Sequence, residues 1–297
     1  MGISIPSLRH LLSLKKIGAI QGDILLLGRM SPQFSTRRFK KTLDRLAIPY
    51  RDTFQERGFD EIFRHNPTDI EVFKAIGFSN VFSLDVNGYE NADFVWDLNF
   101  PINKELRSRF DFVYDGGTIE HIFNFPQVLQ NLHDLLKPEG FIFHENPANN
   151  FVDHGFYQFS PSVFYDYYSA NNYELISSLL CRVSRRKNRS YRAFRYLPVR
   201  FESKSYGGWG RAMLSNIVVV KKHSLSSSGK LPQQSRYTEI FWQNRDSDDL
   251  AKDLSWKKNL ALRFPRIRYW YVRFRRPTLE YISGIFSKIP RRPDFKL

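Results

Sequence analysis

The feature that most constrains the fold is a repeating unit: a short apolar run that ends on an acidic residue or a glycine, followed by a helical pattern. Three such runs are 22–29 (GDILLLGR), 80–86 (NVFSLDV) and 110–117 (FDFVYDGG). Each is too short for a buried helix, and its composition is typical of a strand covered on both faces of a parallel sheet. The repeat therefore predicts an α/β fold.

The segments between these runs carry helical signals. Residues 36–46 place apolar side chains at helical spacing among basic ones. Thr68 and Glu71 have the spacing of a capping box, and Gly77 stands where that helix would end. Pro126 can begin a third helix, because its missing N–H costs nothing there. This third helix has one apolar face, made of Val128, Leu129, Leu132, Leu135 and Leu136.

Four further strands complete the pattern. They are expected at 92–98, 140–147, 173–182 and 215–222, with a helix at 162–170 and a basic, aromatic loop between the last two strands. Alternating strands and helices predict a Rossmann-like, mostly parallel seven-stranded sheet with helices on both faces. In such sheets ligands bind outside the carboxyl ends of the strands. Asp85, Asp97 and Asp115 all fall at these ends, which is the main functional signal.

Residues 110–147 resemble class I S-adenosylmethionine-dependent methyltransferases. Their order of strand, Glu-His turn, helix, Lys-Pro-x-Gly turn and strand is similar to that family's fourth and fifth strands. AIGFSNVFSLDV (75–86) resembles the family's entry to the acid that binds the cofactor ribose, and ADFVWDLN (92–99) resembles the adenine-binding segment. The likeness covers about residues 22–222, and it implies S-adenosylmethionine as the cofactor.

The resemblance implies the following roles. Asp85 would accept hydrogen bonds from the two ribose hydroxyls, since a carboxylate can accept both. Asp97 and Leu98 would contact the adenine, while Gly28 and either Asp115 or Gly116 would lie beside the cofactor, where glycine permits close backbone approach. The competing explanation is that these residues form turns, as Asp85 would with Asn87-Gly88.

The segment after the first strand departs from the family. LLLGRMSPQFST (25–36) keeps only Gly28 where the family has a glycine-rich loop, and the side chains of Arg29 and Met30 would crowd the cofactor. Three outcomes stay open: a divergent methyltransferase, a protein that binds another ligand, and an inactive scaffold. We favour methyl transfer to an unidentified acceptor, such as a small molecule or glycan intermediate, over an inactive binding protein or an RNA methyltransferase.

The sequence offers one candidate catalytic residue. Methyl transfer needs alignment more than a protein nucleophile, but a hydroxyl acceptor needs a base. His154, in the loop after the fifth strand, is the candidate, with His144 and Glu145 at the strand end nearby. A lone loop histidine is more often structural. Glu120-His121 resembles the family's Glu-His pair, and we assign it no catalytic role, since stabilising the turn and the helix start is sufficient to explain it. No metal site is predicted, because no histidine, cysteine and carboxylate cluster has metal-ligand spacing.

The basic residues are distributed unevenly along the chain. Lysine and arginine outnumber acids 45 to 30, for a net charge of +15, and the excess gathers around 182–200 and in the last forty residues. We expect a methyltransferase domain at 1–222, with a helical lead-in at 1–21, and a linker plus a basic C-terminal extension at 223–297.

The extension interleaves basic and aromatic residues over 257–292, which suits an anionic membrane surface or another polyanion. Nucleic acid is not favoured, because no RNA-binding motif is recognisable. The alternative is that its aromatic residues pack back on the domain. Cys181 is the only cysteine and no run of 18 apolar residues occurs, so the expected location is the cytoplasm, with peripheral attachment to a membrane.

Overall fold

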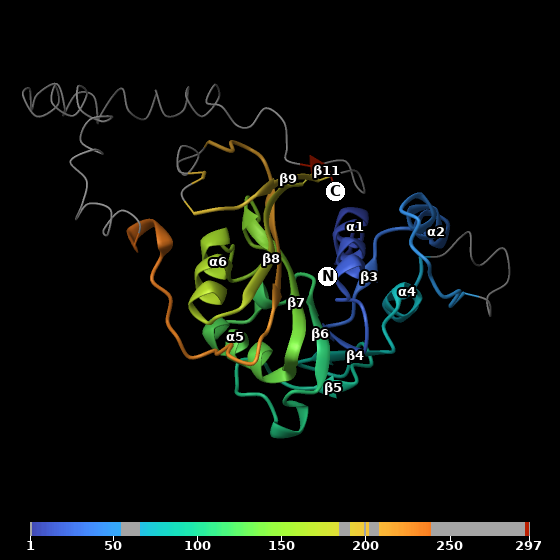
Figure 1. The fold of residues 1–297 in the computed structure, drawn as a ribbon, viewed down its shortest axis with the longest axis horizontal. Helices are drawn as coiled ribbons and strands as arrows, with labels where there is room; N and C mark the ends of the chain where they lie inside the picture. Colours follow the sequence, from blue (N-terminus) through green and yellow to red (C-terminus); the bar gives the residue numbers. More distant parts are fainter. Residues whose placement is uncertain are drawn as a thin grey trace, which may run out of the picture.

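The computed structural model describes residues 2–54, 66–183, 191–198, 200–201, 208–238 and 295–296. Its centre is a sheet with the strand order β11-β9-β8-β10-β7-β6-β2-β4-β5 (Figure 1). The parallel part consists of β5 (Phe94–Val95), β4 (Asn80–Asp85), β2 (Asp23–Leu27), β6 (Phe110–Asp115) and β7 (Leu136–Asn149). The predicted Rossmann-like α/β fold class is confirmed, with parallel pairing among these five strands.

The other side of the sheet is antiparallel. It consists of β10 (Leu214–Lys221), β8 (Glu174–Arg182), β9 (Arg192–Arg195) and β11 (Phe295–Lys296). β9 and β11 extend the predicted seven strands at this edge. The sequence predicts a loop where β9 lies, because four residues with arginine at both ends carry little strand signal. Pairing with β8 and burial of Ala193 and Phe194 stabilise it instead.

Helices cover both faces of the sheet, as Figure 1 shows. On one face lie α1 (Ile5–Ser13), α2 (Thr36–Arg45) and α4 (Asp69–Ile76), and on the other lie α5 (Phe125–Leu135) and α6 (Pro161–Ala170). Short 3-10 turns are η1 (Leu14–Ile17), η2 (Lys104–Leu106) and η3 (Ile119–His121). The expected capping box of α4 is present, with Thr68 and Glu71 bonded reciprocally. The N-terminal lead-in is helical as predicted, and its first residues form β1 (Gly2–Ile3), which pairs with β3 (Ser31–Pro32).

Alternating residues of the central strands supply two separate cores. On β7, Phe141 and Phe143 face the α1 side, whereas Ile142 faces α5 and α6. The aromatic residues of 156–168 are mostly core. Those in the core are Phe159, Phe164, Tyr167 and Tyr168.

Two boundaries differ from the sequence prediction. The third strand, expected at 92–98, is only Phe94–Val95, because Asp97 and Asn99 turn the chain out of the sheet at its edge. The Lys137–Gly140 turn does end α5, but β7 already begins at Leu136 and includes that turn.

The segment after β10 packs on α6. Ser235 donates backbone and hydroxyl hydrogen bonds to Asp166, and Lys230 donates its N–H to Asn171. The domain boundary at 222/223 stays a prediction. The basic stretch 257–292 lies outside the described residues. Within the described part of the chain, no helix is both long and apolar enough to cross a lipid bilayer.

Candidate functional site

The carboxyl ends of the parallel strands meet along one side of the sheet, which we call the carboxyl edge. From β2 the chain crosses to β4 on one side and later returns to β6 on the other, so the strand order reverses between β2 and β6. Ligands of doubly wound sheets bind at such a reversal. Gly28, Asp85, Asp115 and Gly116 all lie at or directly after the ends of these three strands.

The acids of β4 and of the segment after β5 are accessible. Asp85 is half-buried, and its Oδ1 accepts a hydrogen bond from the N–H of Asn87 at 3.3 Å. This is the turn contact that the alternative explanation expected, but it uses one oxygen only. Asp97 is also half-buried, and its Oδ1 accepts from the backbone N–H and side-chain amide of Asn99 at 2.9 and 2.8 Å. Both carboxylates therefore keep acceptor capacity for a ligand.

The two remaining residues expected at this end are buried. Leu98 is 4% exposed, and its carbonyl accepts a hydrogen bond from the amide of Asn131 at 3.0 Å. Gly28 has a φ of 77°, which favours glycine, and donates its N–H to the carbonyl of Leu84 at 2.7 Å. The contacts of these residues with a cofactor stay predictions.

The residues after β2 are held by contacts with the start of α4 and with Gly116. Arg29 forms an ion pair of 2.9 Å with Asp69 at the start of α4, and Asp69 also accepts the N–H of Met30 at 2.9 Å. The Met30 side chain is buried beneath Gly116, where an added Cβ would lie 2.9 Å from the Met30 sulfur. Asp69 thus fixes the path of this glycine-poor loop. The sequence around Asp69 indicates only the start of a helix, so this role could not be predicted from it.

Asp115 is the centre of a fully buried network. Its Oδ1 accepts the N–H of Thr118 at 3.0 Å, and its Oδ2 accepts from His144 Nδ1 and the Asn146 amide at 2.8 and 2.9 Å. His144 Nε2 lies 2.7 Å from the hydroxyl of Tyr168. Burial keeps the pKa of Tyr168 well above its usual value, so the hydroxyl keeps its proton and shares one hydrogen bond with His144 Nε2.

This network changes what Asp115 and His144 are available to do. The whole of Asp115 is 0% exposed, backbone included, so a cofactor contact here would fall to the backbone of Gly116. Both nitrogens of His144 are occupied, which removes it as a general base in this arrangement.

Glu120 is buried beside Asp115. Its Oε2 accepts a hydrogen bond from the same Asn146 amide at 3.0 Å, whereas its Oε1 has no hydrogen-bond partner among the described residues. Burial, with a further contribution from the Asp115 charge, raises the pKa of Glu120 to about 8.

His154 lies in the same place. Its side chain is 49% exposed, and its Nε2 is 3.5 Å from the unpartnered Oε1 of Glu120. Its ring packs against His121 at a centroid distance of 5.1 Å and against Phe151 at 5.7 Å. The sequence pointed to Glu120-His121 and to His154 separately. Only the fold brings them together, because they are far apart in the chain.

Glu145 faces the other side of β7. Its Oε1 accepts a hydrogen bond from Tyr191 at 3.0 Å. This contact lies on the face of the sheet that α1 covers, opposite to the face of His154. Burial raises the pKa of Glu145 to about 7. Of the three possible proton acceptors, His144, Glu145 and His154, only His154 therefore stays a candidate base.

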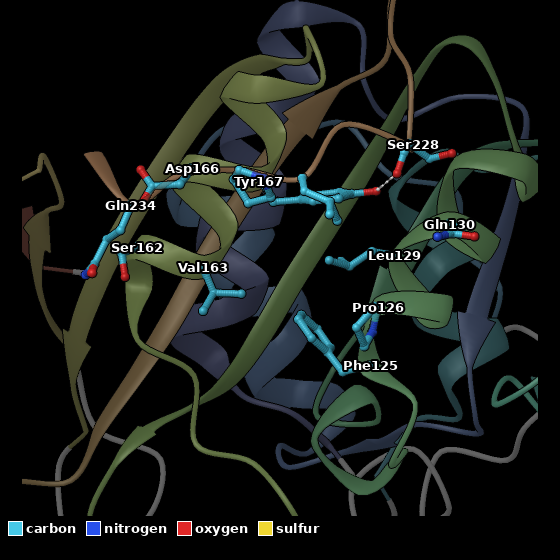
Figure 2. A pocket seen from close by; sticks show the side chains of 13 residues that line it. Phe125, Pro126, Leu129, Gln130, Ser162, Val163, Asp166, Tyr167, Ser228 and Gln234 are labelled. Carbon is cyan, nitrogen blue, oxygen red and sulfur yellow. Dashed lines mark hydrogen bonds between the residues drawn. The ribbon is translucent and has the colours of Figure 1, made fainter. Parts of the chain in front are cut away.

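A cavity of about 480 Å³ lies elsewhere, between α5, α6 and the segment 228–234 (Figure 2). Phe125, Leu129 and Val163 form its apolar wall, and Tyr167 donates a hydrogen bond of 3.1 Å to the carbonyl of Ser228 across it. None of the residues predicted for cofactor binding lines this cavity.

Comparisons with known proteins give likeness in structure only. No protein-family model and no curated protein sequence matches the chain. The 1,6-didemethyltoxoflavin-N1-methyltransferase of Burkholderia thailandensis, solved with S-adenosylhomocysteine, is 11% identical over 73% of this chain and 78% of that chain, with a TM-score of 0.36. A SAM-dependent methyltransferase from Archaeoglobus fulgidus is 11% identical over 73% and 95% of the two chains, with a TM-score of 0.34.

A third solved structure carries a different activity in its name. The [4+2]-cyclase SpnF is 12% identical over 73% of this chain and 81% of that chain, with a TM-score of 0.35. At such identities and TM-scores, the likenesses do not identify an activity for this chain.

Proposed function

We propose that the protein transfers a methyl group from S-adenosylmethionine to a small-molecule acceptor. The observation that carries this proposal is the position of Asp85, half-buried at the end of β4 beside the strand reversal, with its Oδ2 free of hydrogen bonds among the described residues. An acid with spare acceptor capacity at that point suits a ligand with paired hydroxyls, such as the cofactor ribose.

The residues present fit the nucleoside half of the cofactor better than its amino-acid half. Asp85 would hold the ribose, and Asp97 and Leu98 would flank the adenine. At the methionine end, the backbone of Gly116 would do the binding, because the Asp115 carboxylate is already saturated. When bound, the cofactor supplies an electrophilic methyl group on a sulfonium, and the chain's contribution is alignment and exclusion of water.

For a hydroxyl acceptor, His154 is the side chain placed to receive the proton. It is exposed on the carboxyl edge, whereas His144 and Glu145 are buried in other contacts. This assignment rests on position and exposure, which a base must have to reach an acceptor in solution.

One observation favours the alternative of an inactive binding protein. The Met30 side chain packs beneath Gly116, at the point where the methionine end of the cofactor would approach.

The alternative of an RNA methyltransferase rests on net charge alone, and salt-sensitive RNA binding would support it.

The test is isothermal titration of the folded protein with S-adenosylmethionine and S-adenosylhomocysteine. We expect micromolar binding that Asp85→Ala weakens by about 1.5 to 3 kcal/mol, roughly 10- to 150-fold, since a hydrogen bond to a charged group is lost. Glu90→Ala is the matched control, because Glu90 is an exposed acid in the loop that follows β4.

The outcomes separate the alternatives. Unchanged affinity in Asp85→Ala would show that the ribose assignment is wrong while leaving the cofactor in place. A folded parent protein that binds neither compound would favour the inactive scaffold.

A further inference from the structure

The turn at η3 and the loop after β7 form one rigid unit on the carboxyl edge. The N–H of Tyr157 donates to the carbonyl of Glu120 at 3.1 Å, and an added Cβ at Gly155 would lie 2.8 Å from that carbonyl oxygen. The Tyr157 hydroxyl donates to the carbonyl of Phe123 at 2.7 Å. These contacts fix His154 above the turn that carries Glu120 and His121.

The three side chains present their ligand atoms to a common point. One carboxylate oxygen and one ring nitrogen from each histidine lie within 4.8 Å of one another. The His154 Nε2 and Glu120 Oε1 atoms are 3.5 Å apart. Two ligands at bond lengths of about 2.1 Å from one ion are roughly 3 to 3.5 Å apart, so this pair already has suitable spacing. His121, being exposed, needs only a rotation of its side chain.

The Glu120 carboxylate supplies the second observation. The residue is 0% exposed, and its Oε1 points toward the two histidines without a hydrogen-bond partner among the described residues. An unsatisfied buried oxygen costs free energy, which a bound cation would offset. Asn146 already holds the other oxygen, so the carboxylate is oriented before any ion arrives.

We propose that Glu120, His121 and His154 bind a divalent transition-metal ion. Two imidazoles and one carboxylate are a donor set that suits ions such as Zn²⁺ and Co²⁺ rather than the all-oxygen sites of Mg²⁺ or Ca²⁺. Three protein ligands leave coordination positions for water or another oxygen, and the exposed histidines place these positions toward solvent.

The surroundings suit an aromatic or otherwise apolar compound with an oxygen ligand. Phe123 and Phe156 are both about two-thirds exposed and pack edge to face at 5.7 Å beside the three ligands. As a Lewis acid, the ion would lower the pKa of a bound hydroxyl, which would then release its proton to water, so the proposed methyl transfer would not need His154 as its base. Metal binding itself does not depend on that function.

The test is a metal titration of the full chain after treatment with a chelator, without cofactor. Zn²⁺ is followed by calorimetry, and Co²⁺ by its visible absorption, which reports its coordination geometry. We expect one ion per chain, and at least about tenfold weaker binding in His121→Ala, His154→Ala and Glu120→Gln. The two histidine variants change exposed side chains, so they keep the test valid if the glutamine variant fails to fold.

His223→Ala is the matched control. His223 is an exposed histidine 3.3 Å from both Glu139 and Glu174, at the opposite edge of the sheet, and within the described part of the chain it belongs to no group of three ligand atoms that could hold a metal. We expect the parent affinity in this variant. The proposal is overturned if the parent binds neither ion, if the three site variants bind like the parent, or if His223→Ala loses the same ion.

Discussion

The two halves of the carboxyl edge use acidic residues in opposite ways. On the half formed by β4 and β5, Asp85 and Asp97 are half-buried, and their hydrogen bonds to the described residues go to neighbours two positions along the chain. On the half formed by β6 and β7, Asp115 and Glu120 are fully buried and joined by the amide of Asn146.

The difference shows that position in the topology does not decide the role of an acid. All of these residues lie where the fold places ligands, yet burial commits Asp115 to holding two strand ends together and leaves Asp85 free to accept. Glu120 lies between the two cases, since one of its oxygens is bonded and the other is not.

The largest expected effect is on the buried half. Asp115→Ala should lower the free energy of unfolding by about 3 to 5 kcal/mol, because it leaves buried donors on His144 and Asn146 without an acceptor. Urea unfolding followed by circular dichroism measures this. The control is Asp134→Ala, which breaks a surface ion pair with Arg107 and should cost less than about 1 kcal/mol. Equal losses in the two variants would contradict a structural role for Asp115.

A smaller effect concerns Glu145, at the same strand end on the opposite face. Its folded-state pKa of about 7 exceeds the ordinary 4.5, because burial disfavours the charge and the nearby Asp115 adds to it. The folded state therefore holds the proton more tightly, and stability contributed below pH 4.5 is lost as the pH rises toward 7. Ser7 of α1 and Tyr191 are the polar neighbours that hydrogen-bond the Glu145 side chain.

Glu145→Gln should remove this loss. The unfolding free energy of the variant minus that of the parent should rise steadily from about pH 4.5 to about pH 7 and then level off. Urea unfolding at a series of pH values measures it, and the comparison cancels the contributions of Glu120 and His10. Parallel pH curves for the two proteins would contradict the prediction.

The smallest effect is expected on the accessible half. Asp97→Ala removes one acceptor of two local hydrogen bonds from Asn99, at a cost of about 1 kcal/mol in unfolding free energy, because water can replace them at a half-buried site. A loss as large as that of Asp115→Ala would abolish the distinction between the two halves. Thermal unfolding beside the Asp115→Ala variant gives the comparison directly.

The amino-acid sequence by itself determined the elements and their class. The apolar runs of β2, β4, β6 and β7, the Thr68–Glu71 capping box and the apolar face of α5 were all readable, because their signals depend on neighbours within a few residues. Local signals also placed the acids at strand ends, and thereby located the carboxyl edge.

Tertiary structure alone decided what each residue at that edge can do. Whether an acid is saturated, like Asp115, or available, like Asp85, depends on burial by segments far away in the chain. The meeting of Glu120 and His121 with His154, the use of Asp69 to fix Arg29, and the pairing of β9 with β8 are also long-range contacts. No periodicity records such contacts, because they arise when the chain packs on itself and not from the order of its neighbours.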